Sequence, residues 1–359
     1  MPKRLRTLLL SVLTLAVVVA VLEVGASWLM LLHYRAAQVP NFAAEDPSWS
    51  SLVNLARRAG QLAGWRGPPA IREETDPAPF FRPDPVLGYS AAPGHYTHTF
   101  SRRNPFTGAW ESFRTGMTIE PGGARRTGPS RPGQPTVHVL GDSWVFGTGV
   151  PDELTFAARL HQARPDWNVT LRALGGWSLT QAVLNIDRRK EVRPGDVVVL
   201  GYAGYYDVRH VMAPSRLREI DTWLARIGQP VPAFQLPKAA RTADGDVAFS
   251  TIDQRCAELA GYCQRPDPPQ AAMTAVTAAL VNRVARTTAA RVYLLHFAGA
   301  PDPALYAALD PGVTLVRALP GDFDTLVQDD IMGFDGHPGP FWHDAIARRL
   351  LSAIDWKRP

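Results

Sequence analysis

Five short apolar runs alternate with helical segments from residue 136 onward, and this alternation constrains the fold more than any other feature of the sequence. The runs are TVHVLG (136–141), NVTLRAL (168–174), DVVVLGY (196–202), RVYLLHF (291–297) and VTLVRAL (313–319). Strands that are apolar along nearly their whole length are typical of a parallel sheet buried on both faces. The pattern predicts an α/β fold, a three-layer doubly wound parallel sheet of about five strands.

The alternating region is the α/β domain 136–359. Two parts precede it, an N-terminal segment 1–35 and a preamble 36–135. Within the preamble, DPSWSSLVNLARRAGQLAGW predicts one juxtamembrane amphipathic helix with Asp46 as its N-cap. The remaining proline-, glycine- and arginine-rich residues are expected to be irregular, with short extended pieces such as HYTHTF. The long gap between the third and fourth strands predicts an insertion at about 229–270, near a site at the carboxyl ends of the strands.

The N-terminal segment is long enough to cross a bilayer. Residues 8–32 read LLLSVLTLAVVVAVLEVGASWLMLL, and about 20 apolar residues suffice for a spanning helix. Lys3, Arg4 and Arg6 precede the segment, whereas Arg35 is the only basic residue close behind it. The positive-inside rule then predicts a single-pass signal anchor in the cytoplasmic membrane, with the α/β domain on the periplasmic side. A cleaved signal peptide, which usually has a shorter apolar core, is the alternative.

The charge of the chain does not indicate a nucleic-acid partner. The net charge is +5 at pH 7, and the arginines occur as dispersed pairs such as Arg57-Arg58 and Arg125-Arg126. A nucleic-acid-binding surface needs clustered basic residues on one face, which this sequence lacks. We therefore expect no nucleic-acid partner, and the sequence identifies no protein partner.

Two cysteines, Cys256 and Cys263, lie in the stretch CAELAGYC inside the expected insertion. Their spacing differs from that of a CxxC redox pair, and no second pair exists to complete a zinc site. In an oxidising compartment the two can close a small loop. We predict a Cys256–Cys263 disulfide, with no metal and no cofactor.

The first strand ends in Gly141-Asp142-Ser143, and helical sequence follows directly. Ligands of doubly wound sheets bind at the carboxyl ends of the strands, so Ser143 falls where a site is expected. A serine at a helix N-terminus lies near backbone N–H groups that favour developing negative charge. Ser143 is therefore a candidate nucleophile, provided that a base can take its proton.

A candidate base lies near the C-terminus, in FDGHPGPFWHDAIARRLLSAI (334–354). Asp335 and His337 occupy a glycine- and proline-rich turn before an amphipathic helix, and an imidazole oriented by a carboxylate is the usual activator of serine. Between these ends, LGGWSLTQ (174–181) follows the second strand, and Gly176 offers an unobstructed N–H to an oxyanion. GYAGYYDVRH (201–210) follows the third strand at the same edge.

Together these blocks resemble the SGNH/GDSL hydrolase superfamily of esterases and lipases. GDSWVFG is similar to its first block, GGWSLTQ to the second and DGHPGPFWH to the last; FRPDPVLGYSAAPG (81–94) resembles the lead-in of exported, membrane-tethered members. The resemblance implies a flavodoxin-like fold with Ser143 as nucleophile, His337 as base and Asp335 as its orienter. It also implies that the N–H groups of Ser143 and Gly176 form the oxyanion hole.

The chain departs from the family pattern at two positions. The third block of the family ends in Asn-Asp, whereas this chain has Tyr206 followed by Asp207; the phenol of Tyr206 is a weaker candidate for the third oxyanion donor. The family places its acid three residues before the histidine, where this chain has Phe334, so Asp330 is the substitute for Asp335. His343 is the reserve base, although its place on the helix favours packing.

Three functions remain open. The first is a serine esterase that hydrolyses acyl esters, such as O-acetyl groups on envelope or exported polysaccharide. The second is an O-acyltransferase, in which a sugar hydroxyl replaces water in the second half of the same mechanism. The third is a non-catalytic binding protein, which the tyrosine at position 206 would fit.

Overall fold

The structure, a computed structural model of the 359-residue chain, describes residues 11–12, 14–19, 21–22, 71–103, 108–227, 234–297, 302–318 and 337–357. The chain forms two compact units. One comprises Met1–Arg72 and Phe100–Phe113, and the other comprises Glu73–Thr99 and Arg114–Pro359. The main sheet and the candidate site belong to the second unit.

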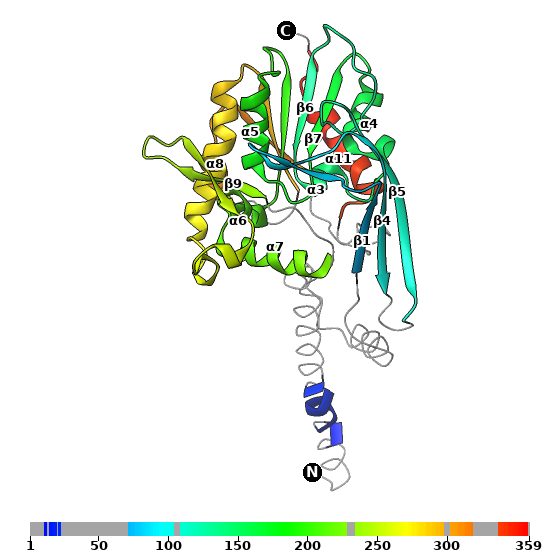
Figure 1. Cartoon of the computed structure of the whole chain (residues 1–359), viewed down its shortest axis with the longest axis vertical. Helices are drawn as coiled ribbons and strands as arrows, with labels where there is room; N and C mark the ends of the chain where they lie inside the picture. The colour runs from blue at the N-terminus through cyan, green and yellow to red at the C-terminus, as the bar shows by residue number, and fades with distance from the viewer. Residues whose placement is uncertain are drawn as a thin grey trace, which may run out of the picture. The chain divides into compact units, whose positions relative to one another are not determined.

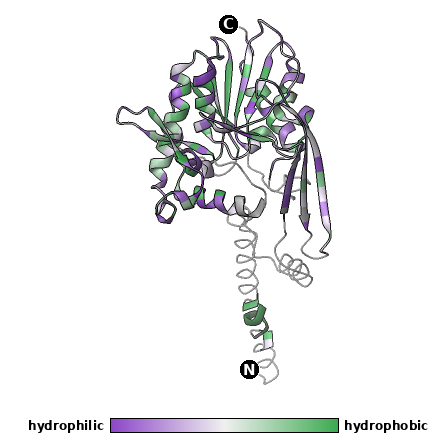
Figure 2. Ribbon diagram, in the orientation of Figure 1, coloured by the Kyte–Doolittle hydropathy of each residue, from purple (hydrophilic) through white to green (hydrophobic). Residues whose placement is uncertain are grey.

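Five parallel strands form the main sheet: β6 (Thr136–Gly141), β7 (Asn168–Ala173), β8 (Val197–Tyr202), β11 (Arg291–His296) and β12 (Val313–Arg317). They lie in the order β12-β11-β8-β6-β7, and neighbouring strands are parallel. The chain thus runs outward from β6 to β7 and then returns past β6 to β8, which is the flavodoxin-like order. The predicted doubly wound sheet is confirmed, and Figure 2 shows that hydrophobic residues are concentrated in its strands.

Helices cover both faces of this sheet (Figure 1). The helices α3 (Ser143–Phe146), α4 (Phe156–Ala163) and α11 (Pro340–Ala353) share one core with alternate residues of β6 and β8. On the other face, α5 (Leu179–Arg189), α8 (Gln270–Thr287) and α9 (Pro303–Ala307) form a second core with the intervening strand residues. Since side chains alternate across a strand, β6, β8 and β11 each supply residues to both cores.

Local sequence explains where the helices begin. Ser178 caps α5, and its side chain and that of Gln181 form a capping box, which satisfies backbone N–H groups at the start of the helix. The hydroxyl of Thr155 accepts a hydrogen bond from the N–H of Ala158 at the start of α4. A 3₁₀ turn, η2 (Asp152–Leu154), precedes α4.

The preamble contains more strands than the few short extended pieces that the sequence predicted, although HYTHTF does lie in a strand. β1 (Ile71–Asp76), β4 (Gly94–Arg103) and β5 (Trp110–Ile119) form a three-stranded sheet, and β2 (Phe81–Asp84) pairs antiparallel with β3 (Gly88–Ala91). These strands are short or keep polar side chains exposed, so they lack the apolar runs that identified the main sheet. The predicted juxtamembrane helix lies outside the described residues.

The expected insertion is a β-hairpin followed by a disulfide loop. After η3 (Gly204–Tyr206), α6 (Asp207–His210) and α7 (Pro214–Ile227), β9 (Gln235–Arg241) pairs antiparallel with β10 (Val247–Asp253). Two 3₁₀ turns follow, η4 (Cys256–Glu258) and η5 (Tyr262–Gln264). Cys256 and Cys263 are disulfide-bonded, with a Cα–Cα distance of 5.7 Å, so the predicted bridge is confirmed.

Only part of the expected membrane segment is described. Residues 11–12, 14–19 and 21–22 are helical, and Leu15, Val21 and Leu22 each expose more than half of their surface. Within the residues for which the structure gives a description, no helix has the length and hydropathy needed to span a bilayer. The signal anchor stays a prediction.

Arg125, near the end of the preamble, binds the carboxyl end of α3 through hydrogen bonds. Its Nε pairs with Asp152 at 2.8 Å, and its Nη1 donates to the carbonyls of Phe146 and Gly147 at 2.7 and 2.8 Å. Its Nη2 donates to the carbonyl of Val150. Burial lowers the pKa of Arg125, which Asp152 opposes by favouring the charged form. A buried cation thus satisfies the carbonyls at the carboxyl end of α3.

We predict that Arg125→Met lowers the free energy of unfolding by about 3–5 kcal/mol, because it leaves the Asp152 carboxylate and several carbonyls without a partner. Arg126→Met is the matched control, since Arg126 is half exposed and pairs only with Glu120 at the surface; it should change stability by less than about 1 kcal/mol. Chemical denaturation of both variants measures the difference. Equal losses would contradict the buried role of Arg125.

Candidate active site

Ser143 lies where the sequence predicted, at the carboxyl end of β6. It is the first residue of α3 and is half-buried, so its hydroxyl is accessible. β6 lies between β7 and β8, the two strands that the chain visits next on opposite sides. Ser143 therefore stands at the topological switch point of the sheet, where ligands of doubly wound folds bind.

Two glycines allow α3 to lie directly against the sheet. A Cβ on Gly141 would come within 2.3 Å of Val145, and one on Gly201 within 2.1 Å of the same side chain. Val145, in α3, is fully buried between the ends of β6 and β8. Since real Cβ contacts do not approach so closely, either alanine substitution would push α3 away from the sheet and displace Ser143.

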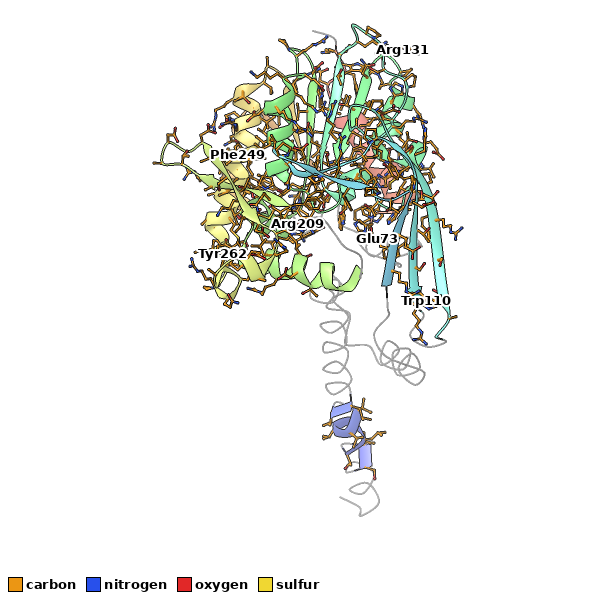
Figure 3. All side chains as sticks on the ribbon, in the orientation of Figure 1. Glu73, Trp110, Arg131, Arg209, Phe249 and Tyr262 are labelled. Atoms are coloured by element: carbon orange, nitrogen blue, oxygen red, sulfur yellow. A yellow bond between two sulfur atoms is a disulfide. The ribbon has the colours of Figure 1, made fainter. Side chains whose placement is uncertain are left out.

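Asp142 is the N-cap of α3, and its buried carboxylate lies beside the Ser143 hydroxyl. Its Oδ1 accepts the N–H of Trp144 at 3.0 Å, and its Oδ2 lies 3.5 Å from the Ser143 Oγ. The Oδ2 also pairs with Nη1 of Arg209 at 3.3 Å. Arg209 is in α6, the helix that follows β8 (Figure 3). The loops after β6 and β8 therefore meet beside Ser143.

Tyr206, the candidate for the third oxyanion donor, is in contact with this ion pair. The Tyr206 ring lies 4.7 Å below the Arg209 guanidinium, and its oxygen accepts a hydrogen bond from the Tyr205 hydroxyl at 3.0 Å. Burial raises the pKa of Tyr206 well above its ordinary value, helped by the charge of Asp142 and a hydrogen bond to it. The phenol of Tyr206 thus stays protonated.

Asp207, the next residue, fixes this loop to the rest of the domain. Its carboxylate accepts hydrogen bonds from Tyr202 at 3.0 Å, Thr274 at 2.8 Å and Thr277 at 2.6 Å, and from the Gln270 amide at 2.7 Å. Thr274, Thr277 and Gln270 all belong to α8. Asp207 is buried, and four donors satisfy a carboxylate that burial would otherwise disfavour. The position of the loop is therefore well determined.

Gly176 lies in the loop after β7, and its conformation requires glycine. Its φ is +78°, and a Cβ would lie 2.6 Å from the Tyr89 hydroxyl. That hydroxyl donates to the carbonyl of Gly175 at 2.7 Å, and burial raises the pKa of Tyr89 to about 12, so it remains a donor. Arg216 of α7 also contacts this loop, with Nη2 at 3.5 Å from the Gly176 carbonyl. Tyr89 and Arg216 thus both hold the loop.

The amino end of α11 contacts α3, the helix that begins at Ser143. The Trp342 ring, in the first turn of α11, contacts the Trp144 ring edge-on with 5.9 Å between centroids. His337, three residues before α11, is half-buried. Asp335, Asp330 and Phe334 lie outside the described residues. The structure brings the start of α11 to the residue after Ser143, and the pairing of Ser143, His337 and Asp335 stays a prediction.

His343, the reserve base, is fully buried in the core. Its ring stacks on Phe156 at 5.6 Å, and its Nδ1 accepts the N–H of Phe156 at 3.1 Å. Burial lowers its pKa to about 3, with a smaller effect from the charge of Arg125. As the sequence favoured, His343 packs inside the protein, and solvent does not reach it.

The structure adds three residues that sequence reasoning missed: Tyr89, Arg209 and Arg216. Tyr89 is part of FRPDPVLGYSAAPG, whose resemblance to the family lead-in was a signal that this segment belongs with the site. Arg209 lies in GYAGYYDVRH, three residues after Tyr206, which is one helical turn and hence the same side. No sequence pattern marked Arg216 as a site residue, because its contact with Gly176 depends on how α7 packs.

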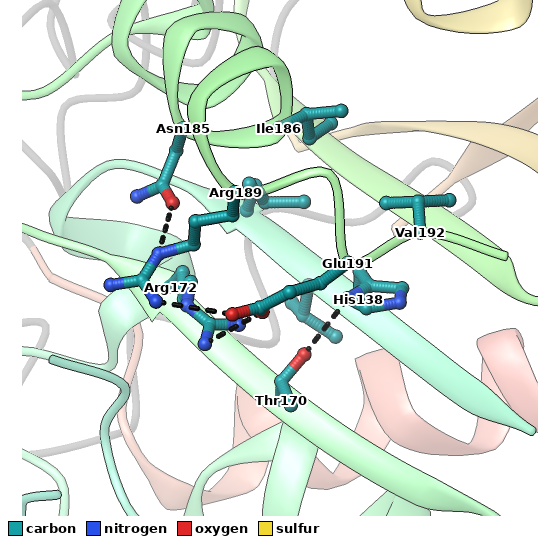
Figure 4. A pocket seen from close by; sticks show the side chains of 10 residues that line it. His138, Thr170, Arg172, Asn185, Ile186, Arg189, Glu191 and Val192 are labelled. Atoms are coloured by element: carbon teal, nitrogen blue, oxygen red, sulfur yellow. Dashed lines mark hydrogen bonds and ion pairs between the residues drawn. The ribbon is translucent and has the colours of Figure 1, made fainter. Parts of the chain in front are cut away.

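A small cavity elsewhere in the domain is not connected with this site. It is lined by mid-strand residues of β6 and β7 and by the carboxyl end of α5, and its volume is about 10 Å³, which is room for one water molecule. Figure 4 shows Arg172 and Arg189 directed toward Glu191, and His138 toward Thr170. Among the described residues, no cluster of three or more His, Cys, Asp or Glu side chains can hold a metal ion.

Comparison with solved structures gives distant matches. The psychrotrophic esterase EstA from Pseudoalteromonas sp. is 12% identical with a TM-score of 0.33, over 62% of this chain and 97% of the esterase. A putative lipolytic protein of the G-D-S-L family from Desulfitobacterium hafniense is 11% identical with a TM-score of 0.32, over 61% and 99%. A family two carbohydrate esterase from Clostridium thermocellum is 13% identical with a TM-score of 0.35, over 79% and 84%.

No protein-family model and no curated protein matches the sequence.

Buried histidines should make the stability of this protein depend on pH. Burial lowers the pKa of His210 to about 3, of His296 to about 4 and of His343 to about 3, whereas the unfolded chain titrates near 6.5. Below about pH 6.5 the unfolded chain binds more protons, so stability falls as the pH is lowered toward 4. Each such histidine contributes a slope of up to about 1.4 kcal/mol per pH unit.

Denaturation between pH 4 and 7 measures this slope. We expect His343→Phe, which retains stacking on Phe156, to show a shallower pH dependence than the wild type. His95→Gln removes an exposed histidine and serves as control. Indistinguishable slopes for the wild type and His343→Phe would show that His343 is protonated in the folded state.

Proposed function

We propose that this protein is a serine esterase of the SGNH/GDSL type, with Ser143 as nucleophile. One observation carries the proposal: the loops after β6 and β8 meet beside a half-buried serine at the switch point of the sheet, and the loop after β7 leaves the same edge. Ser143 begins a helix there, and Arg209 pairs with Asp142 beside it. Tyr89 and Arg216 hold the loop that contains Gly176. This is the arrangement that nucleophilic acyl transfer needs.

In the first half of the reaction, His337 takes the proton of the Ser143 hydroxyl as the oxygen attacks the ester carbonyl. The carbonyl oxygen becomes an oxyanion, and the N–H groups of Ser143 and Gly176 stabilise it. The tetrahedral intermediate collapses, the C–O bond to the alcohol breaks, and His337 returns the proton to the leaving alcohol. The product is an acyl ester of Ser143.

In the second half, His337 deprotonates a water molecule that attacks the acyl ester. The acid leaves, and Ser143 regains its proton. Asp335 would orient the imidazole and stabilise the imidazolium, as the carboxylate does in other serine hydrolases. If a sugar hydroxyl attacks the acyl ester in place of water, the acyl group is transferred to the sugar. The protein would then be an O-acyltransferase that uses the same residues.

We propose that the substrate is an acyl ester outside the cytoplasm, such as O-acetyl groups on a polysaccharide of the cell envelope. The apolar residues 8–32 would anchor the chain in the cytoplasmic membrane, in keeping with the exposure of Leu15, Val21 and Leu22. The Cys256–Cys263 disulfide is of a kind that persists in oxidising compartments, which also supports export.

Labelling with a serine-reactive fluorophosphonate tests the nucleophile directly. We expect the wild type to be labelled and Ser143→Ala not to be labelled at all. His337→Ala should slow labelling and lower kcat/KM for p-nitrophenyl acetate by about 10³-fold or more, since the base is lost. Ser250→Ala, at an exposed serine of β10, is the matched control and should label like the wild type.

Labelling that survives Ser143→Ala would remove Ser143 as the nucleophile, and an unlabelled wild type would favour the binding-protein alternative. Product analysis with an acetyl ester and a polysaccharide acceptor separates the two enzymes. Free acetate as the main product supports the esterase. Acetylated acceptor formed faster than acetate would identify the transferase.

A further inference from the structure

Asp142 poses an electrostatic problem for a nucleophile at Ser143. The Asp142 side chain is 2% exposed, and its Oδ2 lies 3.5 Å from the Ser143 Oγ. Attack by Ser143 creates negative charge close to this carboxylate, and like charges repel strongly where water is excluded. Unless a cation compensates Asp142, the carboxylate raises the energy of the transition state relative to the free enzyme.

Arg209 supplies a cation at that place. Its Nη1 lies 3.3 Å from the Asp142 Oδ2, and its side chain is 14% exposed. Two other charged groups act on Arg209 from α7: Glu219, and Arg216, which forms its own ion pair with Glu219 at 2.7 Å. Arg209 is therefore the cation that faces Asp142, whereas Arg216 is already paired.

The tyrosine pair holds Arg209 in this position. The Arg209 guanidinium lies over the Tyr206 ring at 4.7 Å and over the Tyr205 ring at 5.7 Å. A guanidinium stacked on aromatic rings is fixed in its plane and direction. Through this stacking Tyr206 supports the ion pair between Arg209 and Asp142.

We propose that Arg209 is a positioning residue that neutralises Asp142 beside the nucleophile, and that Tyr206 is retained to hold its guanidinium. In this chain, charge compensation at Asp142 takes over the electrostatic task that a third oxyanion donor performs elsewhere. The inference rests on the proposed esterase function. It explains why a tyrosine is compatible with catalysis at position 206.

A charge-compensation cycle tests the proposal with p-nitrophenyl acetate, a neutral ester. Arg209→Gln should lower kcat by about 100-fold with little change in KM, because it leaves Asp142 as an uncompensated charge. The double variant Asp142→Asn, Arg209→Gln has neither charge, and asparagine also caps helices well. Its kcat should recover to within about tenfold of the wild type.

Two further variants sharpen the cycle. Arg209→Lys keeps the charge and should retain more activity than Arg209→Gln, although lysine loses the stacking of the planar guanidinium. Arg286→Gln removes a half-exposed arginine that pairs with Asp246 and Asp310 at the surface, and it should leave kcat unchanged.

Three results would contradict the proposed role of Arg209. A double variant no more active than Arg209→Gln would show that Arg209 acts only through packing, and would overturn the inference. If Arg209→Gln instead raises KM for an anionic ester and leaves kcat and KM for p-nitrophenyl acetate unchanged, Arg209 is a substrate-binding residue. That result would also overturn the inference. If the wild type neither hydrolyses the ester nor reacts with fluorophosphonate, the esterase proposal fails, and this inference falls with it.

Discussion

The contact of Val145 with Gly141 and Gly201 is the constraint on which the candidate site depends. Because both strand ends lack a Cβ, a side chain of α3 fills the space directly above the sheet. That close packing fixes the first turn of α3 and hence the direction of the Ser143 hydroxyl. Arg125 fastens the other end of the same short helix. A helix of four residues has little stability of its own, so its position is imposed by these neighbours.

Most of the main sheet could be predicted, because β-branched apolar runs and helical periods are local properties of the sequence. All five predicted strands occur, and β6 and β8 read as uninterrupted buried runs. The preamble strands were missed for a physical reason. Strands such as β5 alternate polar and apolar residues over part of their length, and their pairing is determined by tertiary contacts that no local pattern reveals.

The candidate site shows the same division. Ser143 was predicted from its place at the end of an apolar strand, and Gly176 from its place in the next loop at the same edge. Arg209 was not, since the sequence shows neither its ion pair with Asp142 nor its stacking on Tyr206. Arg125 appeared in the sequence as one of several dispersed arginine pairs, yet only its burial gives it a structural role. Side-chain partners across long sequence separations are set by packing.

The hydrogen bonds of Tyr89 join the preamble to the α/β domain, and they decide where the structural unit that holds the candidate site begins. The Tyr89 hydroxyl donates to Gly175, and the Trp177 indole donates to the Tyr89 carbonyl, so both sides of the Gly176 loop depend on β3. A fragment that contains only the α/β sheet and its helices would lack Tyr89, and the Gly176 loop would lose both of these hydrogen bonds. Any fragment or chimera that is to keep the Gly176 loop in place must therefore carry β3 together with the sheet, so its boundary belongs upstream of residue 80.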